Sequence, residues 1–322
     1  MNQDKSELND KKLLSLIIPC YNEEDVIRLF YEEVNKVLVD FKYKYELIFV
    51  NDGSKDNTLK IITMLAIEDE RVKYISFSRN FGKEAAMLAG MKLACGDYIG
   101  ILDADLQHPP RAIINMVQAL DDGYDMAAAR RINRIGEAKL KSYFSKKFYK
   151  IINKMIDIEI ENGAQDFRIM KKKVVKSIIS LPEYHRFSKG IFSWVGFKTK
   201  WFEHENIERP VGISKWSFRK LFKYALDGII AFSTVPLKIS LIVGSLASSF
   251  GFIYGFYIVL KTLILGKETP GYASLMAVIL FFSGVTLICI GILGEYISRI
   301  YIEVKNRPIF IIDETNIENV YD

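Results

Sequence analysis

The chain has 322 residues, of which half are apolar and 13% are aromatic, so it can bury the core of one large domain or of two medium ones. Its formal net charge is +5, with lysine and arginine concentrated in the middle third and beside the apolar C-terminal segments, which favours partners that carry phosphates or acidic headgroups. Cys20, Cys95 and Cys289 lie far apart without metal-ligand spacing, which excludes a cysteine metal cluster and predicts reduced thiols in a cytoplasmic domain. Residues 1–12 are polar, carry no signal-peptide pattern and are expected to form a tail.

Strands and helices are predicted to alternate through the first part of the chain. Short apolar runs predict strands at 13–19, 45–50, 72–77, 98–102 and 124–129. Between them, apolar residues at helical spacing predict helices at 24–40, 58–66, 83–94 and 111–120. Such alternation is typical of an α/β fold with a mostly parallel, doubly wound sheet.

Polar side chains follow three of these strands, at residues 21–23, 51–54 and 103–105. Because ligands of open α/β sheets bind at the carboxyl ends of the strands, the three clusters predict a nucleotide and metal site at one edge. The carboxylates of Asp103 and Asp105 are typical ligands of a hard divalent cation such as Mg²⁺ or Mn²⁺. The alternative is a polar strand end whose aspartates cap the next helix. The sequence has no G-x-G-x-x-G after the first strand and no P-loop motif, so it supports neither of those phosphate sites.

Two long uncharged segments follow near the C-terminus, at residues 239–260 and 271–294. At about 1.5 Å per residue, each can cross a hydrocarbon core of about 30 Å. The alternative is a buried helical hairpin of a soluble core, although such helices seldom run this long without charge. Two lysine-rich amphipathic helices are predicted before them, at 139–155 and 217–232, either as solvated faces or as helices lying on an anionic membrane surface.

The distribution of lysine and arginine predicts the orientation of the two spans. Residues 209–238 and the C-terminal flank carry more positive charges than the short connector, so both termini and the catalytic domain are expected in the cytoplasm, with the connector outside. The protein is therefore expected to be a multi-pass protein of the cytoplasmic membrane. Small residues in both spans would let helices pack closely, also between protomers, so a homo-oligomer is expected.

Six motifs in order, together with the two spans, resemble glycosyltransferase family 2 over about residues 13–305. Within that family, the chain most resembles the polyprenyl-phosphate branch. This branch includes the bactoprenol glucosyltransferases and is related to dolichyl-phosphate mannose synthase. The motifs are Ile18-Pro-Cys-Tyr-Asn-Glu-Glu24, Val50-Asn-Asp-Gly-Ser-Lys-Asp-Asn-Thr58, Ser78-Arg-Asn-Phe-Gly-Lys83, Leu102-Asp-Ala-Asp-Leu-Gln-His-Pro-Pro110, Gln165-Asp-Phe-Arg168 and Arg209-Pro-Val-Gly-Ile-Ser-Lys-Trp216.

The resemblance implies a GT-A (Rossmann-like) fold over residues 13–215, an interfacial helix at 216–235, a transmembrane hairpin at 236–298 and a cytoplasmic segment at 299–322. It implies inverting transfer of one sugar, glucose or N-acetylglucosamine, from a UDP-sugar to undecaprenyl or another polyprenyl phosphate at the cytoplasmic face. The product would serve modification of cell-envelope glycans, with a separate flippase and a downstream glycosyltransferase as partners. The Gln-x-x-Arg-Trp motif of processive relatives is absent from the sequence, which disfavours a polymerase.

The resemblance also implies roles for individual residues. Asp52 would bind the base or ribose, Arg79 and Lys83 would support the nucleotide, and the base pocket would be lined by Pro19, Tyr21 and Glu23. The cation would be held by Asp103, Asp105 and Gln107, whereas His108 is expected to be a loop or capping residue. A basic loop would close over the donor diphosphate with Arg209, Ser214 and Lys215; the alternative is that it anchors the chain at the membrane interface.

Asp166 occupies the position of the family's catalytic base. The nucleophile, however, is a phosphate oxygen whose second pKa is about 6, so it is largely ionised without a base. Asp166 is therefore expected either to orient the acceptor or to stabilise positive charge on the sugar, with Arg168 fixing its position or forming a structural pair. The candidates for binding the acceptor phosphate are Arg130, Arg131, Arg168 and Arg186.

Two other functions are compatible with these residues: transfer to another membrane lipid such as diacylglycerol, and non-catalytic sensing of nucleotide sugars. A nucleic-acid partner is not expected, because the aromatic residues lie among apolar neighbours at helical spacing instead of on an exposed basic sheet.

Overall fold

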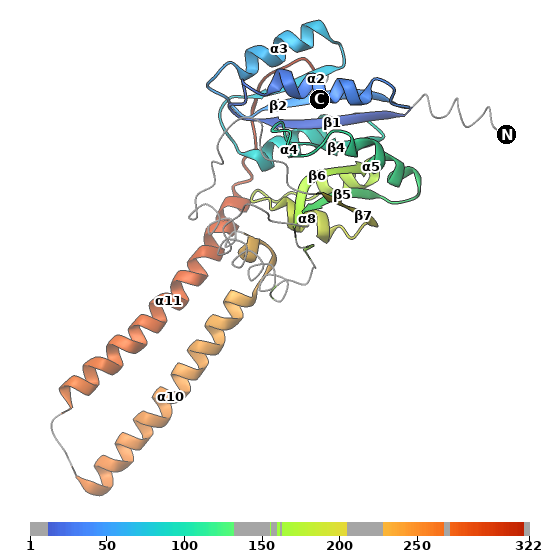
Figure 1. Cartoon of the computed structure of the whole chain (residues 1–322). Coiled ribbons are helices and arrows are strands. Elements are labelled where there is room, and N and C mark those ends of the chain that lie inside the picture. The colour runs from blue at the N-terminus through green and yellow to red at the C-terminus, as the bar shows by residue number, and fades with distance from the viewer. Residues whose placement is uncertain are drawn as a thin grey trace.

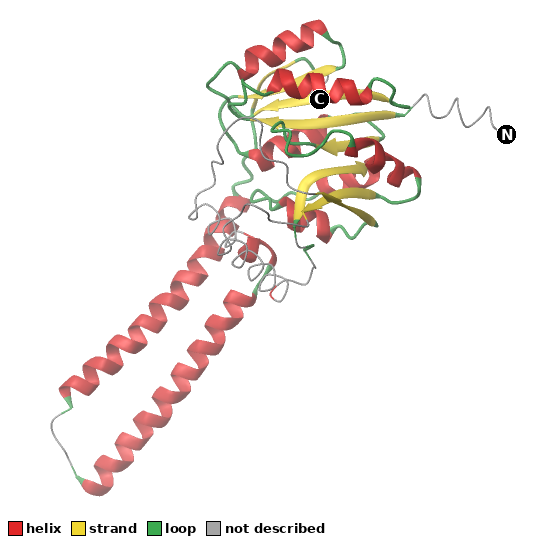
Figure 2. Cartoon of the chain, in the orientation of Figure 1, coloured by secondary structure: helices red, strands yellow, loops and turns green. Residues whose placement is uncertain are grey.

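The computed structural model describes residues 12–131, 155, 160–161, 163–204, 228–266 and 271–318. An α/β domain forms one end of the molecule, and two long helices extend away from it as a hairpin (Figure 1). Figure 2 shows the strands of the domain enclosed between helices.

Within the described residues, the domain is built on an eight-stranded sheet of order β7-β5-β6-β4-β1-β2-β3-β8. Its centre is parallel and consists of β1 (Leu13–Cys20), β2 (Lys44–Asn51), β3 (Val72–Phe77) and β4 (Tyr98–Ile101). β5 (Met126–Arg131) pairs in parallel with β7 (Thr199–His204). The predicted strands between residues 13 and 129, and the mostly parallel sheet, are thus confirmed.

Two antiparallel strands were not predicted. β6 (Ala164–Lys171) lies between β4 and β5 and pairs antiparallel with both. β8 (Ile312–Thr315), near the C-terminus, pairs antiparallel with the edge of β3. The fifth predicted strand therefore does not lie beside the fourth, because β6 from later in the chain occupies that place.

Helices cover both faces of the sheet. One face packs against α2 (Ile27–Leu38), α3 (Thr58–Glu68) and α5 (Ala112–Asp121), and the other against α4 (Lys83–Leu93), α7 (Lys172–Ile179) and α8 (Ser188–Trp194). β1 shows the alternation that this requires, since Leu16 and Ile18 face the first layer and Ile17 faces the second. α4 lies so close to β1 that a Cβ atom on Gly90 would come within 2.3 Å of Ile17.

The hairpin consists of α10 (Val235–Leu265) and α11 (Tyr272–Val304), each long and apolar enough to cross a membrane. None of the residues in their most apolar windows is buried, which contradicts the alternative of a helical hairpin buried in a soluble core. Both helices extend past the predicted spans, and α11 continues six residues beyond the predicted boundary at 298. This extension is polar on one side, with an ion pair between Arg299 and Glu295 one turn apart at 3.6 Å.

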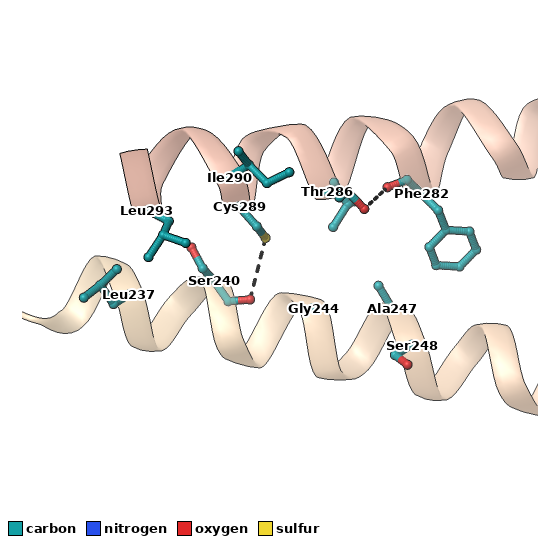
Figure 3. Close-up of a pocket in the computed structure, with 11 residues that line it drawn as sticks. Leu237, Ser240, Gly244, Ala247, Ser248, Phe282, Thr286, Cys289, Ile290 and Leu293 are labelled. Carbon is teal, nitrogen blue, oxygen red and sulfur yellow. Dashed lines mark hydrogen bonds between the residues drawn. The ribbon is translucent and has the colours of Figure 1, made fainter. Parts of the chain in front are cut away.

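An open groove of about 630 Å³ separates the parts of α10 and α11 that lie nearest the domain (Figure 3). Small residues of α10 line one side, including Gly244, where an added Cβ atom would meet nothing within 4 Å. On the other side, Cys289 donates to the Ser240 carbonyl across the groove at 3.7 Å. Within one chain the small residues therefore leave a gap here, and the close packing between protomers expected from the sequence stays a prediction.

Candidate active site

The loops that follow β1 and β2 are joined by hydrogen bonds between backbone and side chains. The Asn22 amide donates to Ser54 Oγ at 2.9 Å, and the Lys55 amide donates back to Asn22 Oδ1 at 2.9 Å. Gly53 has a φ of 63°, and a Cβ atom there would lie 2.4 Å from the backbone carbon of Arg79. Only glycine fits this position, so the loop after β2 packs directly against the segment before α4.

Asp52 connects these loops to the start of α4. Its carboxylate is buried and accepts hydrogen bonds from the backbone amides of Phe81 at 2.6 Å and Gly82 at 3.0 Å. Burial raises the pKa of Asp52 to about 6, although both hydrogen bonds oppose this shift. The structure thus gives Asp52 a role in positioning residues 81–83, besides the predicted role in nucleotide binding.

Lys83 lies between two of the predicted catalytic aspartates. Its Nζ is 2.7 Å from Asp103 Oδ1 and 2.6 Å from Asp166 Oδ2. Asp103 follows β4 and Asp166 lies on β6, which are neighbouring antiparallel strands with Ile101 opposite Arg168. The unpredicted position of β6 is therefore what brings the two carboxylates to one ammonium group.

The surrounding charges keep Asp166 ionised. Burial alone would raise the pKa of Asp166, but the nearby positive charges of Lys83, Lys189 and Arg168 outweigh it and hold the pKa well below its ordinary value. A carboxylate with so low a pKa is poorly matched to accept a proton near neutral pH. This agrees with the expectation that a phosphate acceptor needs no base.

The candidate metal ligands form a short segment after β4. Asp105 Oδ1 accepts a hydrogen bond from the Gln107 amide at 3.1 Å, and Leu106 between them has a φ of 53°. Within the described residues, no three His, Cys, Asp or Glu side chains are grouped to hold a metal. Two carboxylates and an amide oxygen fit Mg²⁺, which commonly completes its coordination with water and substrate phosphates. His108 is buried 5.1 Å from the Phe167 ring, consistent with its expected role in the loop.

The predicted base-pocket residues lie at the open edge of the site. Pro19, next to the last residue of β1, and Glu23 are partly exposed, and Tyr21 is 37% exposed. Arg79 is also exposed, and its guanidinium lies 4.0 Å from the centroid of the Phe81 ring. These side chains are accessible to a nucleotide, as the prediction requires.

The four arginines proposed for the acceptor phosphate are in different environments. Arg168 and Arg186 are buried, and each donates to backbone carbonyls: Arg168 to Gln165 at 2.5 Å, and Arg186 to Leu181 at 2.9 Å. These contacts indicate structural roles for both.

Arg130 and Arg131 end β5, at the same edge of the sheet as Asp166. Arg130 forms ion pairs with Glu161 at 2.7 Å and Glu203 at 2.5 Å, and is partly exposed. Arg130 and Arg131 are therefore more accessible to an acceptor phosphate than Arg168 and Arg186, although a phosphate at Arg130 would compete with the two glutamates.

The structure adds Glu84 and α8 to the site. The Glu84 carboxylate accepts hydrogen bonds from the amide and the hydroxyl of Ser188, so the first turn of α4 is attached to the start of α8. Lys189 follows directly and contributes to the low pKa of Asp166. No sequence signal identifies this contact, because α8 lies about a hundred residues after α4 in the chain.

Arg209, Ser214 and Lys215, the predicted lid, lie outside the described residues, as do the predicted amphipathic helix at 139–155 apart from Met155 and most of the one at 217–232.

Comparisons with known proteins agree with this fold. Residues 15–179 match glycosyl transferase family 2, and residues 235–300 match the GtrB C-terminal hairpin. The putative glycosyltransferase CsbB of Bacillus subtilis strain 168 is 44% identical over 307 residues, covering 95% of this chain and 93% of that protein. The bactoprenol glucosyl transferase of Shigella phage SfII is 45% identical over 303 residues, covering 94% and 98%. A crystal structure of a mycobacterial protein has the same fold, with a TM-score of 0.50 and 17% identity over 70% of this chain and 76% of that one.

The site and these matches define a glycosyltransferase. The chain belongs to glycosyltransferase family 2 and combines the catalytic domain of that family with a GtrB-type C-terminal hairpin.

Proposed function

We propose that this protein transfers a single sugar from a UDP-sugar to a polyprenyl phosphate at the cytoplasmic face of a membrane, with inversion at the anomeric carbon. The observation that carries this proposal is the identity of 45%, over 94% of the chain, to a bactoprenol glucosyl transferase, which includes both the catalytic domain and the hairpin. The name of that relative makes glucose the first sugar to test and N-acetylglucosamine the second.

The charges of the site support this reaction. The phosphate nucleophile is already ionised near neutral pH, so Asp166 acts by orienting the acceptor and by stabilising the positive charge that develops on the sugar. Lys83, held between Asp103 and Asp166, fixes both carboxylates on the side of the site where the donor diphosphate is expected. Arg130 and Arg131 supply positive charge for the acceptor phosphate.

The enzyme is proposed to depend on Mg²⁺ or Mn²⁺. Asp103, Asp105 and Gln107 would hold the cation, which stabilises the charge of the departing nucleoside diphosphate as a Lewis acid. The other roles would fall to residues of the chain: the loops after β1 and β2 would bind the nucleotide, and Asp166 on β6 would act at the anomeric carbon.

The membrane topology follows from the same proposal. The acceptor phosphate is attached to a bilayer lipid, so the domain must lie beside a membrane surface. We assign it to the cytoplasmic surface, where nucleotide sugars are, with α10 and α11 crossing the bilayer and their connector outside. The positive charges that flank the hairpin support this orientation. Association of protomers, and cooperation with a flippase and a downstream glycosyltransferase, are further expectations of this proposal.

The test uses membranes that contain the full chain, undecaprenyl phosphate and Mg²⁺, with radiolabelled UDP-glucose or UDP-N-acetylglucosamine supplied in turn. We expect label from one donor to enter a mild-acid-labile lipid with a β-linked sugar. Chelation by EDTA or Asp105→Asn should abolish the product, whereas Asp40→Asn, an exposed aspartate at the end of α2, should leave it unchanged.

Two outcomes would overturn the proposal in different ways. Label that enters diacylglycerol instead would support the alternative lipid acceptor. Metal-dependent binding of a UDP-sugar without transfer to any lipid would support a sensor that lacks catalytic activity.

A further inference from the structure

The C-terminal segment returns from the membrane hairpin to the catalytic domain. After α11 ends at Val304, the chain turns at Asn306 with a φ of 44° and continues as β8 along the edge of β3. The two strands are joined by side chains as well as backbone. The Tyr74 amide donates to Asn316 Oδ1 at 2.7 Å, and Thr315 Oγ1 donates to the Tyr74 carbonyl at 2.6 Å. Residues 309–317 therefore form part of the domain, although they follow both membrane helices.

An aromatic stack joins this segment to the loop before α4. The Phe310 ring lies parallel to the Phe77 ring, with centroids 5.1 Å apart and an interplanar angle of 13°. Phe77 in turn contacts the Phe81 ring edge-on at 5.7 Å. Immediately after Phe77, the Ser78 amide donates to the Ile311 carbonyl at 3.1 Å. Both ends of the segment 77–81 are thus held by contacts that begin in the C-terminal segment.

This loop leads directly to the catalytic residues. The amide of Phe81 donates to the buried Asp52 carboxylate. Gly82, with a φ of 99°, follows, and the next residue, Lys83, begins α4. Lys83 then contacts Asp103 and Asp166. A continuous series of packed and hydrogen-bonded groups therefore runs from Phe310 to the reacting part of the site.

The end of α11 also contacts the opposite side of the site. Glu303 Oε1 accepts a hydrogen bond from the Tyr184 amide at 2.9 Å, in the segment before α8. α8 begins with Ser188, which binds Glu84 of α4. The last turn of the membrane hairpin and the strand after it thus contact the two segments, 77–83 and 184–189, that contribute Lys83 and Lys189.

We infer that Phe310 is a positioning residue for catalysis: through Phe77 and Phe81 it holds the segment that places Lys83 and the amides bound by Asp52. Its contact makes the geometry of the donor site depend on the C-terminal segment that follows the second membrane helix. The catalytic consequence rests on the function proposed above, whereas the structural consequence does not.

The first experiment measures hydrogen exchange of the full chain in lipid nanodiscs, without substrate. In Phe310→Ala, we expect the amides of Phe81 and Gly82 to exchange about tenfold faster, because the opening of a local segment costs less when its packing is lost. Asp52→Asn, which weakens the acceptor of those amides, should accelerate the same two positions. Ile311→Ala is the matched control, since this adjacent side chain is 54% exposed and should leave both amides unchanged.

The second experiment measures transfer by the same variants. We expect kcat of Phe310→Ala to fall by about tenfold to a hundredfold, because small displacements of catalytic groups have effects of this size. Phe310→Tyr keeps the ring and should restore both kcat and slow exchange. Phe310→Leu keeps apolar volume without the ring, and should show an intermediate loss even if the alanine variant does not fold.

The inference is overturned if Phe310→Ala or Phe310→Leu folds with unchanged exchange at Phe81 and Gly82, or if Ile311→Ala has the same effect as Phe310→Ala. Faster exchange at those two amides with unchanged kcat would also overturn it, because loosening the segment would then have no effect on the reaction. If the wild-type protein transfers no sugar but the exchange pattern is as expected, the proposed function fails while the structural coupling stands.

Discussion

Lys83 Nζ lies 2.6 Å from Asp166 Oδ2, although 83 residues separate the two in the chain. The contact joins the first residue of α4 to β6, and the Asp166 side chain lies on the face of the sheet that α4 covers. The Lys83 side chain is 41% exposed, so water screens the ion pair and the pair contributes little to the stability of the fold. Its main effect is to position the Asp166 carboxylate and to keep it ionised.

The first prediction concerns this pair. Lys83→Met should lower kcat by about 10²-fold, the usual cost of removing one preorganised electrostatic group. The pKa of Asp166 should rise as well, because burial is then opposed only by the charges of Lys189 and Arg168. Steady-state kinetics measure kcat, and the ¹³C chemical shift of the Asp166 carboxyl group across pH measures its pKa in both proteins.

Lys60→Met provides the matched control, because Lys60 is an exposed lysine on α3. It should leave both kcat and the pKa of Asp166 unchanged. Normal kcat and an unmoved pKa of Asp166 in Lys83→Met would contradict the assigned role.

The second prediction concerns Asp121, at the end of α5, which stabilises the fold away from the site. Burial alone would raise the pKa of Asp121, but hydrogen bonds lower it to about 2. The donors are Lys42, Tyr98, Tyr43 and Lys12. Since the unfolded pKa is about 3.9, this carboxylate stabilises the native state above that pH, and the contribution is lost as pH falls towards 2.

Asp121→Asn should therefore reduce the free energy of unfolding at pH 7 by about 2 kcal/mol, within the range for hydrogen bonds to charged groups. The difference from wild type should shrink as the pH is lowered below 4. Denaturation with urea at several pH values measures this. The neighbouring Asp122→Asn, at an exposed position, should have little effect, and an equal loss in both variants would refute the assignment.

The third prediction concerns Glu84, whose pKa burial raises to about 7. Between the unfolded pKa of about 4.3 and pH 7, the native state binds more protons than the unfolded state, so this group reduces stability as the pH rises through that window. Glu84→Gln does not titrate, and glutamine can still hydrogen-bond to Ser188. The variant should gain about 1–2 kcal/mol over wild type at pH 8 and little near pH 5.

Thermal denaturation at both pH values would measure the gain, with Glu32→Gln, an exposed glutamate on α2, as the control. A gain in stability of Glu84→Gln that does not vary with pH would contradict the raised pKa of this partly buried carboxylate.

The fourth prediction separates structural from substrate-binding arginines. Arg186 donates to the carbonyls of Leu181 and Ile178 at the end of α7, so Arg186→Ala should cost about 1–3 kcal/mol of stability, because it leaves carbonyls unpaired. Arg28→Ala, which breaks an exposed ion pair with Glu68, should cost less than about 1 kcal/mol. Denaturation curves measure both.

Arg130→Ala should instead raise the KM for the polyprenyl phosphate with little change in stability, because Arg130 is partly exposed. A higher KM for Arg186→Ala in a fully folded protein would assign Arg186 to the acceptor site.

The sequence alone determined the central part of this protein. The alternation of apolar strands and amphipathic helices between residues 13 and 129 depends on local periodicity, and polar residues after parallel strands must meet at one edge. Asp52 and Asp103 were therefore identifiable from the sequence, as were the two apolar spans, whose length and lack of charge need no tertiary context.

Only the tertiary structure decided which partners those residues have. Whether β6 pairs beside β4 depends on contacts between strands over 60 residues apart, and no local pattern encodes them. The same holds for β8, which is short and pairs with β3 although the whole hairpin of α10 and α11 separates the two strands in the chain. The contacts of Lys83 with Asp166 and of Phe310 with Phe77 follow from these two pairings, because side chains distant in the chain meet only where the backbone has already placed them.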